Sequence, residues 1–235
     1  MKSAAIVSRT IRSAPRALRT RVFLATAILG MHLALPAAAD SLDDLFNAAK
    51  LGDVSEITLQ VSRGMDPNAS DPNGNTLLII AARENQPTVV AELLRQPGIK
   101  LNARNTVGDS AIMLASLRGN TGIVEQLLKA GAAFDDEGWN PLLYAAFEGR
   151  VEIVDLLLAR GANVNALAPN KSTPLMFAAR NGHDDVVARL LKAGAKLDLK
   201  NDQNETAEGW ALKHRNTDIA EMIQAERKAR AARGR

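Results

Sequence analysis

The sequence predicts an all-α fold, a solenoid of about six helix-turn-helix repeats joined by short hairpin loops, and three observations support this prediction. First, a unit that runs from Ser172 to Asp198 has counterparts along most of the chain after residue 40. Second, one alanine of this unit recurs at spacings of 30 to 34 residues, at Ala48, Ala81, Ala115, Ala145, Ala178 and Ala211. Third, pairs of aliphatic residues follow this alanine at a constant offset. Self-similarity at such a period is typical of chains in which each repeat packs on its neighbours.

Each element of the unit has a local physical reason. Thr173-Pro174-Leu175 opens a first helix, because proline is tolerated in the first helical turn, where its missing N–H would have no partner anyway. Gly182-His183 ends that helix. The second helix carries Val186-Val187 and Leu190-Leu191, which are spaced to form one apolar stripe. Gly194 then suits the left-handed conformation that commonly ends a helix.

This unit, with its turn, its two helices and its period near 33 residues, resembles the ankyrin repeat. Its opening motif recurs as Thr76-Leu77-Leu78, Ser110-Ala111-Ile112, Asn140-Pro141-Leu142 and the degraded Thr206-Ala207-Glu208. The resemblance covers about residues 41–224 and predicts repeats near 41–70, 71–104, 105–136, 137–167, 168–200 and 201–224, within a domain of residues 40–226. It implies a binding scaffold and leaves the partner open, because ankyrin arrays with unrelated targets share one fold.

Irregular repeats give further expectations. Repeats one and six carry polar residues where the others have aliphatic ones, which is typical of the capping repeats at the ends of an array. The linker from Ala132 to Gly138 is three residues shorter than the equivalent segment from Ala162 to Lys171, so we expect a shortened hairpin loop there. Lys171 replaces a glycine of the other hairpins. If this position needs a positive φ, the lysine costs on the order of 1 kcal/mol.

Residues 1–39 predict a secretory signal peptide. They contain six basic residues and no Asp or Glu, and an apolar run from Val22 to Leu35 follows the basic part. This run of about 14 residues is shorter than the roughly 20 residues of a membrane-spanning helix. Ala37-Ala38-Ala39 supplies the small residues of a cleavage site, so we expect a mature chain that begins at Asp40, is periplasmic or secreted, and keeps no stable membrane anchor. The alternatives are a retained anchor and an organelle transit peptide.

The charge of the expected mature body argues against one class of partner. Residues 40–226 hold 18 basic and 26 acidic side chains, a net charge of −8, whereas the whole chain has a formal net charge of +3. The body therefore lacks the basic footprint of a nucleic-acid-binding domain. Residues 227–235 form a basic tail with five Lys or Arg residues. This tail is either a solvated helix end or a segment that contacts phosphates or an anionic membrane.

Groups that could perform catalysis or bind a metal are few. The chain has no cysteine and three histidines, of which His32 lies in the expected signal peptide. His183 occupies the position at which, by the resemblance, a histidine braces the backbone of the neighbouring repeat. His214 has no second His or Cys at ligand spacing. Asp135-Asp136-Glu137 is typical of a solvated turn, with attraction of a cation or a basic partner as the alternative. We therefore expect no enzymatic activity, no cofactor and no metal.

The resemblance implies a non-catalytic protein–protein interaction module, expected to be monomeric. Its role would be that of a scaffold, helper or protector of another envelope protein. The alternative is a stoichiometric inhibitor or immunity-type protein that acts on an enzyme or toxin. An enzyme is the third and least supported hypothesis, because no paired acid and base or nucleophile motif is present.

The resemblance also implies where the partner binds, namely at hairpin tips and at exposed positions of the first helices. Two and three residues after the recurring alanine, these positions are Arg83-Glu84, Leu117-Arg118, Phe147-Glu148 and Arg180-Asn181. We expect an exposed apolar patch of Leu117, Trp139 and Phe147, bordered by Arg118, Glu148 and Arg180. Aromatic residues ringed by charge are typical of a binding hot spot. The alternative is that Trp139 and Phe147 fold down over the gap beside the short linker.

Overall fold

The computed structural model describes residues 35–233, and most of the expected signal peptide lies outside this range. The chain divides into two compact units, Met1–Asp43 and Asp44–Arg235, and the repeats belong to the second. In the described range the regular elements are twelve helices, accompanied by two isolated β-bridges. The first helices of the pairs are α2 (Leu35–Leu51), α4 (Leu77–Arg83), α6 (Ala111–Arg118), α8 (Pro141–Phe147), α10 (Pro174–Asn181) and α12 (Ala207–Lys213). The second helices are α3 (Val54–Ser62), α5 (Pro87–Leu93), α7 (Thr121–Lys129), α9 (Val151–Ala159), α11 (Asp184–Lys192) and α13 (Thr217–Arg233).

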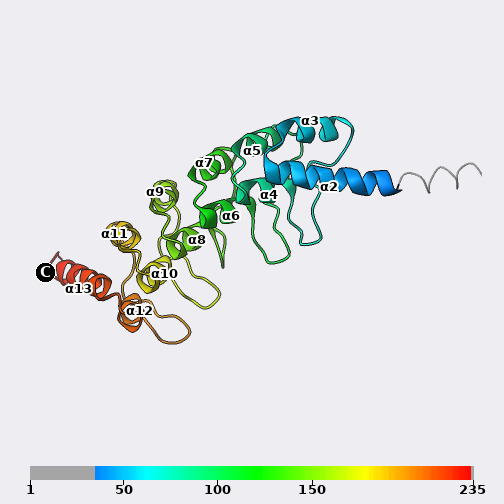
Figure 1. Cartoon of the computed structure of the whole chain (residues 1–235). Coiled ribbons are helices and arrows are strands. Elements are labelled where there is room, and N and C mark those ends of the chain that lie inside the picture. The colour runs from blue at the N-terminus through cyan, green and yellow to red at the C-terminus, as the bar shows by residue number, and fades with distance from the viewer. Residues whose placement is uncertain (1–34, 234–235) are drawn as a thin grey trace, which may run out of the picture. The chain divides into compact units, whose positions relative to one another are not determined.

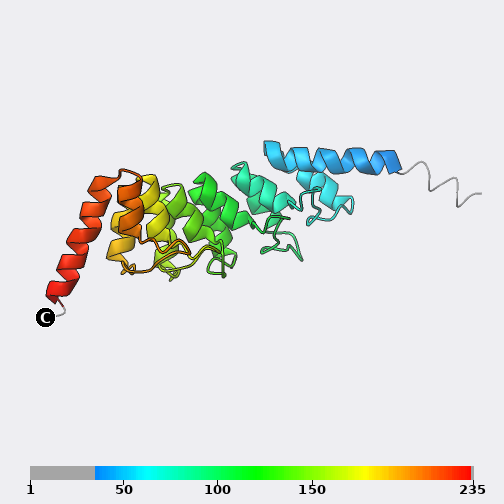
Figure 2. The ribbon, with the colours of Figure 1, turned by 90° about the horizontal axis from the view of Figure 1, so that it is seen from below.

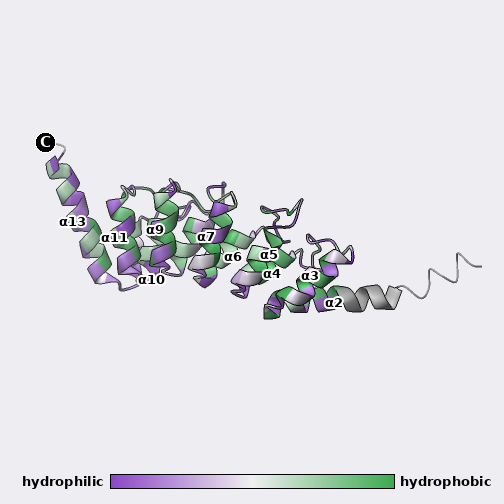
Figure 3. Cartoon of the chain, turned by 90° about the horizontal axis from the view of Figure 1, so that it is seen from above, coloured by the Kyte–Doolittle hydropathy of each residue, from purple (hydrophilic) through white to green (hydrophobic). Residues whose placement is uncertain are grey.

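Within the unit Asp44–Arg235, the helices form two layers. The first helices α4 to α12 pack side by side in one row, and the second helices α3 to α13 pack in another (Figure 1). Hairpin loops project from the ends of the first helices (Figure 1). Green hydrophobic and purple hydrophilic residues alternate along α7, α9 and α11, as expected of helices that bury one face (Figure 3). The all-α repeat solenoid that the sequence predicts is therefore confirmed.

The recurring alanine marks the contact between neighbouring first helices. All six copies are buried, with at most 4% of the residue surface exposed. The apolar stripe of the second helices is buried at Ile153, Val154 and Leu157 of α9 and at the equivalent positions of α11. A small residue on the first helix lets the next repeat approach closely, and the aliphatic pairs then fill the space between the layers.

Side-chain caps explain why the opening motif starts with Thr or Asn. The side chain of Thr76 accepts a hydrogen bond from the backbone N–H of Ile79, and Asn140 accepts one from Leu143. Thr173 and Thr206 cap α10 and α12 in the same way. These bonds satisfy amide groups that a helix leaves without an internal partner.

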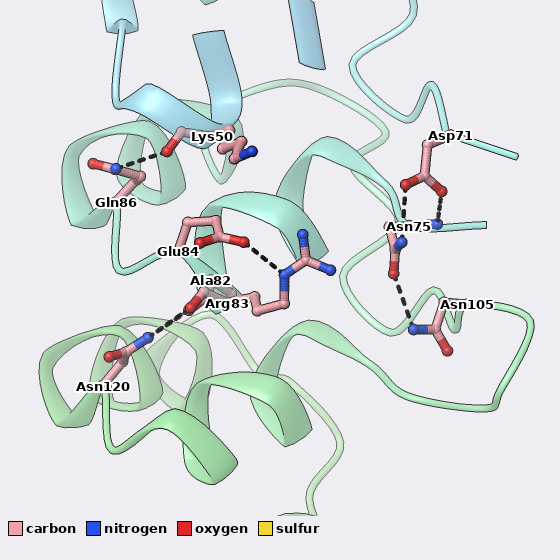
Figure 4. A network of polar contacts seen from close by, with 9 residues as sticks. All are labelled: Lys50, Asp71, Asn75, Ala82, Arg83, Glu84, Gln86, Asn105 and Asn120. Carbon is pink, nitrogen blue, oxygen red and sulfur yellow. Dashed lines mark hydrogen bonds and ion pairs between the residues drawn. The ribbon is translucent and has the colours of Figure 1, made fainter. Parts of the chain in front are cut away.

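A ladder of polar contacts ties each repeat to the one before it. From repeat two onward, the residue that precedes the second helix contacts a carbonyl at the end of the first helix of the preceding repeat. Gln86 donates to Lys50 O (2.9 Å) and Asn120 to Ala82 O (2.8 Å; Figure 4). His183 Nε2 lies 3.0 Å from the carbonyl oxygen of Phe147. Since a carbonyl can only accept, this imidazole nitrogen carries the proton. The expected bracing role of His183 is confirmed.

The ladder requires glycine at the end of α8. Gly149 has a φ of +70°, and a Cβ added there would lie 2.6 Å from His183 Nδ1. Gly161 has a similar φ of +86° but no atom within 4 Å of such a Cβ. Both alanine substitutions impose the left-handed penalty of about 1–2 kcal/mol, and Gly149→Ala also collides with the imidazole.

We therefore expect Gly149→Ala to lower the free energy of unfolding by at least about 1 kcal/mol more than Gly161→Ala. Urea unfolding of the two variants measures this difference. Equal losses would show that the contact between Gly149 and His183 carries no stability.

Lys171 adopts the strained conformation that its place in the hairpin suggests. Its φ is +60°. The glycines at the equivalent position of other hairpins, Gly74, Gly108 and Gly138, also have positive φ values. The Lys171 ammonium lies 2.8 Å from the Asp202 carboxylate in the next hairpin. Both side chains are largely exposed, so this pair offsets little of the strain.

Helix α13 continues beyond residue 224 and takes in most of the basic tail; Figure 2 shows it in red as a long helix at the C-terminal end. Arg227 pairs with Asp198 and with Glu208, the latter at 3.0 Å. Arg230 donates to the carbonyls of Leu191 (3.1 Å) and Ala195 (2.8 Å) at the end of α11. These two arginines therefore fasten α13 to the array.

Candidate binding surface on the first helices

One register position of the first helices carries a row of large side chains. This position, four residues after the helix cap, is occupied by Ile80, Leu114, Tyr144, Phe177 and Trp210. The first two are aliphatic and the last three aromatic, so the aromatic part of the row lies over α8, α10 and α12. Because equivalent positions of neighbouring repeats lie side by side, this spacing brings Phe177 and Trp210 into contact, and Trp139 stacks on both Tyr144 and Phe177.

The aromatic cluster consists of Trp139, Tyr144, Phe147, Phe177 and Trp210. The ring centroid of Trp139 lies 4.9 Å from that of Tyr144 and 5.2 Å from that of Phe177, and both pairs are stacked. Phe177 also meets Phe147 at 5.8 Å and Trp210 at 5.9 Å, both edge to face. Such pairs contribute about 0.5–1.5 kcal/mol beyond the burial of their area. Phe177, with 3% of its surface exposed, is the centre of the cluster.

Tyr144 connects the cluster to the hairpin of the preceding repeat. Its hydroxyl donates to Asp109 Oδ1 at 2.7 Å. Burial disfavours the charged phenolate and raises the pKa of Tyr144 above its ordinary value of 10.0, and the hydrogen bond to Asp109 and the charge of Asp109 raise it further. The phenol therefore stays neutral and donates across the repeat boundary over the whole physiological range.

Tyr144 is the single tyrosine of the chain, so an absorbance titration reports on it alone. We expect it to ionise well above pH 10 in the folded chain. Asp109→Asn should bring the pKa down without restoring the ordinary value, because burial is the larger cause. In the unfolded chain the phenol loses its proton near pH 10, so its contribution to stability is present below that pH and is lost as the pH rises above it. A midpoint near 10 in the folded chain would contradict this environment.

The structure brings some of the expected site residues together. Trp139 and Phe147 are half-buried and both contact Phe177, and the Arg180 guanidinium lies 5.3 Å from the centroid of the Trp210 ring. Sequence reasoning did not include Tyr144, Phe177 or Trp210 in the site. The signal that identifies them is the run of aromatic residues at one equivalent position of successive repeats.

The remaining expected residues lie around this cluster or apart from it. Leu117 is half-buried, Arg118 is exposed, and Glu148 lies 3.6 Å from Arg150. Arg83 and Glu84, at the end of α4, pair with each other at 2.8 Å (Figure 4). Whether Leu117, Trp139 and Phe147 act as one hot spot stays a prediction.

A concavity of about 450 Å³ lies beside the shortened hairpin and is lined by residues 135–138, 163 and 165–169. Asp135 accepts a hydrogen bond from the backbone N–H of Asn163, and Asp136 pairs with Arg104 of the preceding repeat. Trp139 stacks on Tyr144 and Phe177 and is not among the residues that line this concavity. Within residues 35–233, no group of three His, Cys, Asp or Glu side chains could hold a metal ion. In the same range no helix has both the length and the apolar character needed to cross a bilayer.

Comparisons with known families agree with this architecture. Models of ankyrin repeats match residues 73–106 (Ankyrin repeat), 91–168 (Ankyrin repeats, 3 copies) and 157–207 (Ankyrin repeats, many copies). Among curated proteins, the mouse B-cell lymphoma 3 protein homolog is 33% identical over 117 residues, which are 47% of this chain and 26% of that protein. A putative ankyrin repeat protein of Rickettsia bellii is 28% identical over 145 residues, 57% of this chain and 41% of that protein. The matches thus span less than half of these relatives.

Two solved structures are similar over most of their own length. The ankyrin repeat domain of Bcl-3, a member of the IkappaB protein family, is 32% identical with a TM-score of 0.68, over 77% of this chain and 81% of that one. A chain in the complex of a predatory endopeptidase from Bdellovibrio bacteriovorus with an immunity protein is 30% identical with a TM-score of 0.69. That match covers 77% of this chain and 96% of the other.

Proposed function

This chain belongs to the ankyrin-repeat family, and we propose that it is an exported, non-catalytic module that binds another protein of the cell envelope through its first-helix face. The observation that carries the proposal is the aromatic cluster over α8, α10 and α12. Trp139 and Phe147 present half-buried rings there, and Arg180 lies over the ring of Trp210. Aromatic residues with arginine are the usual anchors of protein interfaces. Its role would be that of a scaffold, helper or protector of the partner.

A second role is favoured by one comparison. The structure from Bdellovibrio bacteriovorus is a complex of an endopeptidase with an immunity protein, and its matched chain is covered almost completely by this one. By analogy, this chain would inhibit an enzyme of its own envelope by stoichiometric binding. A one-to-one complex in which the partner loses activity supports inhibition, whereas a partner that stays active supports the scaffold, helper or protector role.

Capture from the native envelope fraction tests the proposal. We expect the tagged chain to retain a partner that the same chain with Trp139→Ala and Phe147→Ala does not retain. The matched control is Leu59→Ala, an apolar residue that is 42% exposed on α3, in the layer of second helices. Equal recovery by the aromatic variant and the control would refute binding through the aromatic cluster.

Export is a separate part of the proposal and rests on the basic and apolar organisation of residues 1–39. We expect the mass of the native protein to correspond to a chain that begins at Asp40. An intact Met1 start on a protein recovered from the cytoplasm would contradict export. That result would leave the binding role to be judged by the capture experiment alone.

A further inference from the structure

The second half of α13 has no counterpart in the other second helices. α13 spans 17 residues, whereas α9 and α11 span nine residues each (Figure 2). The first half of α13 buries Ile219, Ala220 and Ile223. None of residues 225–233, which we call the strap, is buried. The strap is therefore not held to the array by a buried apolar face.

The packing between the strap and the preceding second helix is also incomplete. A concavity of about 750 Å³ lies between α11 and α13. Leu191 of α11 lines it on one side, and Met222 and Ala229 of α13 line it on the other. Apolar contact therefore contributes little to the position of the strap.

Polar contacts of two arginines hold the strap in place. Arg227 pairs with Asp198 and Glu208, and Arg230 donates to two carbonyls at the end of α11. The side chain of Arg227 is 41% exposed and that of Asp198 is 82% exposed. Ion pairs as exposed as these are individually weak, and salt screens them.

Glu208 connects the strap to the first helix of repeat six. The other opening motifs bury an aliphatic residue at this position, namely Leu78, Ile112, Leu142 and Leu175. Glu208 instead accepts from Gln224 at 2.8 Å through one carboxylate oxygen and from Arg227 at 3.0 Å through the other. Gln224 itself stands where α11 has Leu191. In the last repeat a polar contact thus replaces an aliphatic one, and Arg227 of the strap completes it.

We propose that the strap is a reversible clamp on repeat six. In the closed position it holds α12, whose Trp210 packs edge to face on Phe177 at 5.9 Å. When the arginine contacts break, α12 and α13 open while the preceding repeats stay folded. A solenoid permits this local opening, because each repeat contacts only its neighbours.

The proposal goes beyond the proposed function, since the clamp acts in the chain without a partner. Trp210 forms one end of the aromatic cluster, so the strap determines whether that end of the candidate binding surface is ordered.

Amide hydrogen exchange of the whole chain, followed by NMR, tests the clamp. The Trp210 N–H donates to Thr206 O within α12, and at the equivalent position of α6 the Leu114 N–H donates to Ser110 O. Leu114 is therefore a matched internal reference. Raising the NaCl concentration from about 0.1 to about 1 M should speed exchange at Trp210 at least about fivefold relative to Leu114, because salt screens the pairs of the strap.

Variants at low salt assign the effect to the strap. Arg227→Gln should speed exchange at Trp210 at least about fivefold, whereas Lys228→Gln, which removes the same charge from an exposed position of α13, should change it less than about twofold. Glu208→Gln combined with Arg227→Gln should speed exchange by less than the product of the two separate effects, because both substitutions break the same contact.

Three results would overturn the clamp. The first is exchange at Trp210 in Arg227→Gln that stays within about twofold of the unmodified chain. The second is equal acceleration at Trp210 and Leu114 by salt, since the array would then open as one unit. The third is independent action of Arg227→Gln and Glu208→Gln. Because no partner is involved, each of these results would leave the capture experiment, and with it the proposed function, unaffected.

Discussion

Leu157→Ala is expected to lower the free energy of unfolding by roughly 2 to 5 kcal/mol, and Leu190→Ala by a similar amount. Both leucines are fully buried between the two helix layers, on α9 and α11. Truncation removes their transfer free energy and leaves a cavity between helices that belong to different repeats. In a solenoid this weakens a nearest-neighbour interface, and such interfaces hold the array together in place of one central core.

Chemical denaturation followed by circular dichroism measures the loss. Leu212→Ala is the matched control, because Leu212 is 52% exposed on α12 and its truncation should change stability by no more than about 0.5 kcal/mol. Losses below about 1 kcal/mol at both Leu157 and Leu190 would mean that the apolar stripe does not carry the packing between repeats.

The second large effect is expected in binding. Trp139→Ala or Phe147→Ala should weaken the complex with the captured partner by about 2 kcal/mol or more, close to a thirtyfold rise in Kd. Both rings keep part of their surface accessible, and both pack against Phe177. This packing already fixes the two side chains in the free protein, so they lose little conformational entropy when the partner binds.

Thermal melting separates this role from packing within the chain. Each ring packs against a neighbouring ring, so each substitution also lowers the melting temperature to some extent. A hot spot shows a large loss of affinity at temperatures where the variant is fully folded. A large loss of stability with unchanged affinity would instead assign Trp139 and Phe147 to the support of Phe177.

Local patterns made the repeat architecture predictable from the sequence. The recurring alanine is buried in all six copies, and His183 contacts the preceding repeat as expected. These features depend on residue spacings within one repeat, and these spacings recur from repeat to repeat. Ankyrin-repeat neighbours among the solved structures confirm the fold that follows from them.

The candidate site was less predictable, because it depends on contacts between repeats. Tyr144, Phe177 and Trp210 are spaced 33 residues apart, and the contact of Phe177 with Trp210 follows only when equivalent positions are aligned. Arg227 and Arg230 looked like parts of a free basic tail, since their partners Asp198 and Leu191 lie on an earlier repeat.

Hydrogen exchange of the captured complex tests the central claim most directly, because it locates the partner on the array. The account predicts that binding slows exchange in α8, α10 and the hairpins that precede them, around Trp139 and Ser172. It predicts no change in α7, α9 and α11, which belong to the other layer. Protection that is concentrated on α7, α9 and α11, with the first helices unchanged, would contradict it.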